Sequence, residues 1–147
     1  MEYTIISGGI SGAIDDPYGD EAMAHAEMYY KEIRSFSTDV KRISVNTGIK
    51  EEDVLAIKNY LFMDMHLIDG EIRLFDANFH IAESWRRLAF DFKNVESHDF
   101  TLLYHELMEM RLVGLGIERQ KAHDLTSEKY NYQAESDLFY EKLRSGR

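Results

Sequence analysis

Hydrophobic residues recur at steps of three and four along most of this chain, the spacing that places side chains on one face of an α-helix. Five such stretches predict helices: residues 20–43, 51–63, 76–88, 100–115 and 117–143, the last in two parts that meet near residue 132. Gly48 is placed to cap the first helical region and Asp76 to begin the third. The polar residues 94–99 are expected to form a loop.

One short segment departs from this helical period. Residues 67–72 carry an Asp-Gly pair between β-prone neighbours, which indicates a small hairpin or a wide loop. We therefore predict a mainly α fold, a compact multi-helix single domain over residues 19–147 with at most a minor β-hairpin. Residues 1–18, with Gly8, Gly9, Gly12 and Pro17, are expected to form a flexible N-terminal arm.

Composition narrows the class of protein. A chain of 147 residues with 44% hydrophobic residues can bury a core without cross-links, and zero cysteines exclude disulfides and thiolate zinc sites. No apolar run approaches the roughly 20 residues of a membrane span, and the first 14 residues lack the basic start of a signal peptide. The net charge of −10 disfavours nucleic acid as a partner. We expect a location in the bacterial cytoplasm or in a virion.

The predicted helix over residues 100–115 holds the pentapeptide His105-Glu106-Leu107-Met108-Glu109 among apolar neighbours. His105 and Glu109 lie one helical turn apart and can contact one ion, as in the HExxH motif of zinc peptidases with the second histidine replaced by glutamate. In such sites the intervening glutamate, here Glu106, activates water. The third ligand must come from elsewhere, and His123 and His66 are the candidates. A divalent metal, zinc first among them, is the implied cofactor.

A buried polar network is the alternative interpretation. Carboxylates in an apolar segment need a compensating cation, and arginine is the usual partner. The arginines available are Arg86, Arg87 and Arg111. Since Trp85 fits the apolar stripe of its own helix, one of the next two residues must point near the core. We therefore predict that Arg86 or Arg87 reaches a carboxylate of the central helix, Glu106 or Glu109.

A catalytic site without metal is also compatible with these residues. His105 paired with a glutamate could act as a general base near neutral pH, and Arg87 would then stabilise an anionic transition state. The other histidines, His25, His80 and His98, are expected at the surface or at helix ends. The segment around Gly48 has helix-turn-helix spacing, but its second helix opens with acidic residues, which favours a helical corner over a DNA reader.

Several segments together resemble a module of phage proteins from Gram-positive bacteria. The chain is similar to the C-terminal module of Mu F-like minor head (head morphogenesis) proteins, which also occurs alone or in toxin-like contexts. The residues that carry the resemblance are 24–30, 38–40, 57–62, 81–88, 103–109, 122–123 and 129–132. The resemblance implies a phage or prophage origin and an effector role, but no particular reaction.

Two functional hypotheses follow. The first is a small phage-derived effector enzyme, a hydrolase built on His105, Glu106, Glu109 and His123 with a divalent metal. The second is a non-catalytic module that binds a host or virion protein, in which the central polar residues only stabilise the fold. The first requires His105, Glu109 and either His123 or His66 to converge on one cleft.

Overall fold

The computed structural model describes residues 16–146. Within them, seven α-helices, two short helical turns and one two-stranded sheet follow one another along the chain. They are α2 (Asp20–Ser35), α3 (Asp39–Thr47), α4 (Glu51–Lys58), the π-helical turn η2 (Asn59–Met63), β1 (His66–Ile68), β2 (Glu71–Arg73), α5 (Phe79–Phe90), the 3-10 turn η3 (Phe92–Asn94), α6 (Ser97–Gly114), α7 (Arg119–Lys129) and α8 (Tyr132–Ser145). The predicted mainly α class is confirmed. None of the helices over residues 16–146 combines the length and hydrophobicity of a bilayer span.

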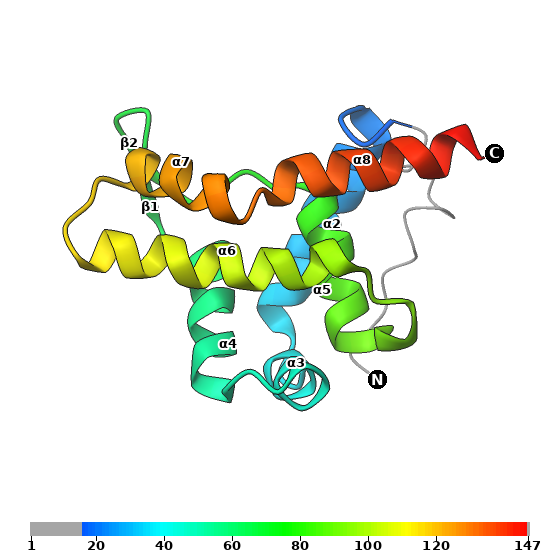
Figure 1. Ribbon diagram of the computed structural model, residues 1–147, viewed down its shortest axis with the longest axis horizontal. Coiled ribbons are helices and arrows are strands. Elements are labelled where there is room, and N and C mark those ends of the chain that lie inside the picture. Colours follow the sequence, from blue (N-terminus) through cyan, green and yellow to red (C-terminus); the bar gives the residue numbers. More distant parts are fainter. Residues whose placement is uncertain (1–15, 147) are drawn as a thin grey trace.

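Helix α6 is the longest helix and crosses the middle of the molecule, with α7 and α8 along one side of it and α3 and α4 on the other (Figure 1). It contacts α4, α5, α7 and α8. This arrangement explains why its sequence is apolar over much of its surface. Its exposed large hydrophobic residues are Tyr104 and, near its C-terminal end, Val113, so the helix is not buried all round.

The main core lies between α2, α3, α4, α5 and α6 and is built around Trp85. This side chain is fully buried, as its place in the apolar stripe predicts, and its ring packs edge-on against Phe62. The other large core residues are Tyr29, Ile33, Ile43, Ile57, Leu88, Leu102 and Leu103. Residues from five helices thus fix the position of α6, which carries the candidate site.

Both turn predictions are confirmed. Gly48 ends α3 in the left-handed conformation, with φ of 79°, and its amide donates to Ser44 O. Strands β1 and β2 pair in antiparallel register, Leu67 opposite Ile72, and are joined by Asp69 and Gly70 with φ of 51° and 81°. Two successive positive φ angles are those of a tight hairpin turn, which is why an Asp-Gly pair is found there.

The helix expected over residues 20–43 is divided in two. The chain turns extended at Phe36, and α3 begins at Asp39. The buried Lys58 fixes this break, because its ammonium group donates to Phe36 O and to Asp39 Oδ1, each at 2.9 Å. Trp85 Nε1 donates to the other oxygen of the same carboxylate. A regular hydrophobic period continues across the break, so periodicity alone did not show it.

Helix starts also differ from the prediction. Asn78, not Asp76, caps α5, since its side chain accepts from the amide of Ile81. Helix α6 begins at Ser97, inside the segment expected to be a loop, because Glu96 and Asp99 form a reciprocal capping box. Capping carboxylates make such a segment look polar although its last residues are helical.

Two further expectations concern the ends of the domain. Helix α8 buries Tyr132, Ser136 and Tyr140, whereas Leu138 and Leu143 are 51% and 38% exposed. The predicted arm over residues 1–18 lies mostly outside the described residues. Its last member, Tyr18, donates a hydrogen bond to Asp137 of α8, so the residues just before α2 pack on the domain.

Candidate metal centre and its cavity

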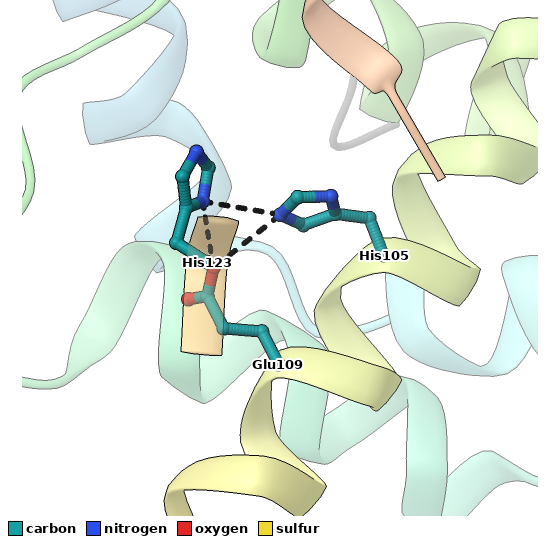
Figure 2. Close-up of side chains that lie close together, drawn as sticks. All are labelled: His105, Glu109 and His123. Carbon is teal, nitrogen blue, oxygen red and sulfur yellow. Dashed lines mark hydrogen bonds and ion pairs between the residues drawn. The ribbon is translucent and has the colours of Figure 1, made fainter. Parts of the chain in front are cut away.

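Three potential metal ligands converge between α6 and α7. His105 and Glu109 project from consecutive turns of α6, and His123 comes from the middle of α7 (Figure 2). Glu109 Oε1 lies 2.8 Å from His123 Nδ1 and 3.3 Å from His105 Nε2, and the two histidine nitrogens are 3.2 Å apart. The convergence of His105, Glu109 and His123 is therefore confirmed. It is the only such group of metal-ligating side chains found in residues 16–146.

The hydrogen bonds around this triad orient its ligand atoms. His105 Nδ1 lies 2.8 Å from the carbonyl oxygen of Tyr130, and since a carbonyl only accepts, Nδ1 carries the proton. In the neutral ring Nε2 then presents a lone pair toward a carboxylate oxygen. A proton or a metal cation is required between two such acceptors. Metal-binding histidines typically donate their other ring N–H to a backbone carbonyl or a carboxylate, as His105 Nδ1 does to Tyr130 O.

Glu109 is held by its second oxygen. Tyr60, on the π-helical turn η2, donates to Glu109 Oε2 at 2.6 Å. Burial opposes ionisation of Glu109, but its contacts with His105, His123 and Tyr60 outweigh burial and lower its pKa to about 2. The contact with Glu109 raises the pKa of His123, against the effect of burial. Glu109 is therefore a carboxylate with one oxygen left for the triad.

The three atoms fit a tetrahedral ion. Zinc sites in proteins hold nitrogen and oxygen ligands about 2.0–2.2 Å from the metal, which places neighbouring ligand atoms roughly 3.3 Å apart. The separations of 2.8, 3.2 and 3.3 Å match this spacing. A point about 2 Å from all three atoms lies roughly 1 Å outside their plane. Two histidines with one glutamate are also a donor set of catalytic zinc sites, in which the fourth position stays open.

Glu106 lies beside the triad and opens onto a cavity. It is 6% exposed, and its Oε2 has no hydrogen-bond partner among the residues described. Burial, followed by the charge of Glu109, raises its pKa well above the usual range. The cavity has a volume of about 340 Å³ and lies among α5, α6, α7 and α8. His105 and His123 line the same cavity, so two members of the triad and the unpaired carboxyl group face one space.

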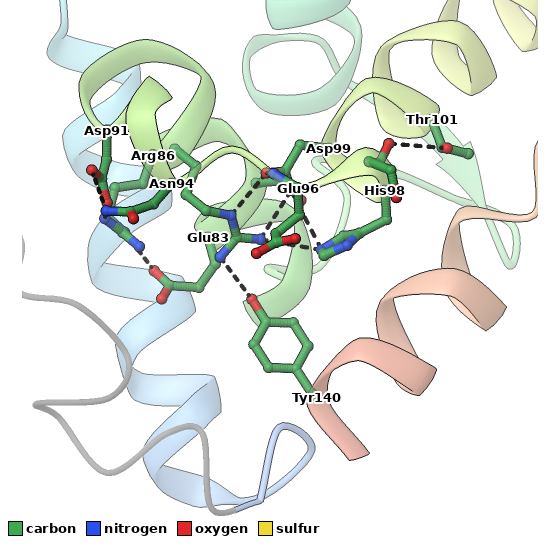
Figure 3. Close-up of polar contacts among 12 residues, drawn as sticks. Glu83, Arg86, Asp91, Asn94, Glu96, His98, Asp99, Thr101 and Tyr140 are labelled. Atoms are coloured by element: carbon green, nitrogen blue, oxygen red, sulfur yellow. Dashed lines mark hydrogen bonds and ion pairs between the residues drawn. The ribbon is translucent and has the colours of Figure 1, made fainter. Parts of the chain in front are cut away.

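The predicted ion pair of the central helix exists with a different carboxylate. Arg87 donates to both oxygens of Asp99, at 2.8 and 2.9 Å, and to Tyr140 Oη at 3.2 Å (Figure 3). Burial disfavours the charge, but the contacts with Asp99 and Tyr140 outweigh it and raise the pKa of Arg87. Glu106 and Glu109, the expected partners, are not in this pair. Arg87 is not among the residues that line the cavity, so it does not take the position expected of a group that stabilises a transition state there.

The neighbouring Arg86 is also paired within its own region. Its Nε donates to Glu83 at 3.1 Å and its Nη1 to Asp91 at 3.0 Å. Arg87 therefore joins α5 to the start of α6, whereas Arg86 is paired within α5 and with the residue that follows it. The polar network that was the alternative interpretation of the central helix is real, but it lies two turns before His105, not at the pentapeptide.

His66 lies outside the triad. Its Nε2 is 2.7 Å from the carbonyl oxygen of Tyr60, and its ring stacks on Phe75 at 3.9 Å. It thus ties the β-hairpin to the turn that carries Tyr60. Of the two candidate third ligands, His123 is the one that the fold brings to His105 and Glu109.

The histidines expected at the surface are buried. His25, His80 and His98 are 2%, 3% and 3% exposed, so the expected surface position is wrong, although His80 and His98 do lie in the first turns of α5 and α6. Each ring contacts a polar side chain from another part of the chain: Glu83 for His25, Ser136 for His80 and Arg87 for His98. Nothing in the local sequence around these histidines distinguishes them from exposed ones. His80 lines the same cavity as Glu106, and sequence reasoning missed it.

Comparison of the chain with models of protein families, with curated proteins and with solved structures finds no match. The geometry of the triad and the cavity is therefore the basis for a functional assignment.

Proposed function

We propose that this protein is a metal-dependent hydrolase, with one divalent ion held by His105 Nε2, Glu109 Oε1 and His123 Nδ1. The observation that supports it most is the convergence of these three atoms within 3.3 Å beside a buried glutamate whose Oε2 is unpaired. Zinc is the ion that best fits two imidazoles and one carboxylate in a tetrahedral arrangement. When bound, zinc would lower the pKa of a coordinated water and polarise a carbonyl oxygen.

Glu106 is the general base of the proposed reaction. It follows His105 directly on α6 and lines the cavity that His105 and His123 also line. A divalent cation held beside Glu106 would favour its ionised form. The ionised carboxylate accepts a proton from water as the water oxygen bonds to the substrate carbonyl carbon. The same proton then passes to the leaving nitrogen or oxygen as its bond to carbon breaks. Water is consumed, no oxidant or reductant is needed, and Glu106 returns to its starting state.

The lining of the cavity favours amides and esters over phosphate esters. No lysine or arginine is among its lining residues, while Glu106 and Asp124 contribute carboxyl groups. Sites for phosphoryl groups normally supply such cations to neutralise the charge. Together with the resemblance to a phage module, this chemistry would suit an effector that cleaves a host component.

The test separates metal binding from catalysis. Purified protein is stripped with a chelator and titrated with Zn²⁺ by calorimetry, and hydrolysis of a peptide library is followed by mass spectrometry. We expect about one bound equivalent in the wild type. Glu109→Gln should weaken zinc binding, whereas Glu106→Gln should keep it and lower turnover by roughly 10²–10⁴-fold, the range for a general base.

Glu128→Gln is the matched control, because this glutamate is exposed on α7 and outside the cavity. It should behave as the wild type in both assays. A wild type that binds no zinc would contradict the metal centre and favour the non-catalytic interaction module. Full activity of Glu106→Gln would contradict its role as the base.

A further inference from the structure

His80 lies at the edge of the cavity with one ring nitrogen unused. The residue is 3% exposed, and its Nε2 has no hydrogen-bond partner within residues 16–146. It lines the cavity that holds Glu106, His105 and His123, and also a smaller adjoining cavity of about 130 Å³. A buried polar atom without a partner costs free energy, and a ligand in the cavity would offset that cost by supplying the missing bond.

The hydrogen bonds on the other side of the ring determine which form of His80 is present. Ser136 Oγ donates its only hydrogen to Gln133 O at 3.1 Å. His80 Nδ1, 3.0 Å from the same hydroxyl oxygen, must then be the donor of that pair. The carboxylate of Asp137 lies 3.6 Å from Nδ1 and also favours a proton there. In the neutral ring Nε2 is consequently an acceptor.

The ring is held in this orientation. It stacks on Tyr140 with centroids 4.6 Å apart and an interplanar angle of 11°, and Tyr18 packs edge-on at 5.5 Å. Burial lowers the pKa of His80 to about 4, against the opposing effect of Asp137. His80 is therefore a fixed, uncharged acceptor at neutral pH.

We infer that the cavity binds an uncharged amide whose N–H group donates to His80 Nε2. This inference rests on the proposed function and names its substrate class. A donor is required because Nε2 only accepts in this form. An anion is disfavoured, because Glu106 and Asp124 line the cavity and no lysine or arginine of residues 16–146 does. An amide meets both needs, and it offers the carbonyl group that the triad and Glu106 would act on.

His80 is then a specificity-determining residue and not part of the metal centre. It comes from the first turn of α5, whereas the triad comes from α6 and α7. A substrate would be oriented from two sides: its N–H by His80, and its carbonyl toward His105, His123 and Glu106. Esters, which lack the N–H, would enter the same cavity but leave the nitrogen of His80 unpaired.

The direct test observes His80 in the wild-type protein. The ¹⁵N resonance of His80 Nε2 is followed by NMR during titration with N-methylacetamide and, as a matched probe, N,N-dimethylacetamide, which differs in lacking the N–H. Glycerol provides a neutral O–H donor and sodium acetate an anion. We expect saturable movement of the His80 resonance with N-methylacetamide and none with the dimethyl compound or acetate. Equal responses to both amides, or a response to glycerol alone, would overturn the inference.

A variant supplies a second measurement. His80→Phe keeps an aromatic ring to stack on Tyr140 and removes the acceptor, and Glu128→Gln is the control outside the cavity. In an active enzyme, His80→Phe should raise the KM for amides at least tenfold with little change for the corresponding esters. An equal change for both classes would contradict the assignment. Zinc titration of the same variants distinguishes the two proposals. If the metal centre is wrong, the protein does not bind Zn²⁺; if only the role of His80 is wrong, Zn²⁺ still binds but amides and esters respond alike to His80→Phe.

Discussion

Replacement of Arg87 by methionine tests a deeply buried ion pair of the fold. Arg87 and Asp99 are 5% and 0% exposed, and two N–H groups of the guanidinium donate to the two carboxylate oxygens. Methionine keeps an apolar stem of similar length but removes every donor. The carboxylate of Asp99 would retain its bonds from Ser84 Oγ and the amide of Glu96, and its contact with His98 Nε2 at 3.4 Å.

The burial of this ion pair determines how much unfolding free energy the variant should lose. Breaking a buried ion pair from one side costs about 3–5 kcal/mol, because a charge is left uncompensated in the interior. Domains of this size are stable by only about 5–15 kcal/mol, so the variant should lose a large share of its unfolding free energy. The melting temperature should fall by roughly 6–20 °C. Since Asp99 also caps α6, the loss should loosen the helix that carries His105.

Urea unfolding followed by circular dichroism measures the effect. Arg73→Met is the matched control, because its ion pair with Asp76 is largely exposed and should contribute at most about 1 kcal/mol. Adding Asp99→Asn to Arg87→Met should recover part of the loss, since the orphaned charge is removed. A cost below about 1 kcal/mol for Arg87→Met would refute the reasoning, as would a double variant less stable than the single one.

Two further predictions concern the site. Tyr60→Phe removes the hydrogen-bond donor of Glu109 Oε2 and should weaken Zn²⁺ binding by about 10–100-fold, the usual effect of losing a group that orients a metal ligand. Calorimetry that shows unchanged affinity would contradict this. The pKa of His80 is about 4 in the folded protein and 6.5 in the unfolded chain, so the unfolded state binds the proton first as the pH falls. His80 alone should therefore lower the free energy of unfolding by about 2 kcal/mol between pH 7 and pH 5. Urea titrations of His80→Phe at both pH values should lack this part of the loss, and an identical pH dependence would be inconsistent with it. The charged and titratable groups that act on His80 are Asp137, His98, Arg144 and Arg87.

The sequence by itself determined the helical class, the hairpin and the two candidate metal ligands that α6 contributes. Hydrophobic period and turn residues such as Gly48 and the Asp69-Gly70 pair depend on local sterics, which act in any context. The same holds for His105 and Glu109, because i and i+4 residues share a face wherever a helix forms. These features were predictable since their cause lies within a few residues along the chain.

Only the tertiary structure decided which distant groups meet. The choice of His123 over His66 depends on how α7 returns along α6, and the partner of Arg87 depends on a helix start that capping, not hydrophobicity, sets. The burial of His80 likewise results from α8 packing over α5, which no local pattern records. Contacts between segments far apart in sequence depend on how the whole core packs, and that packing is where the ligand triad and its cavity arise.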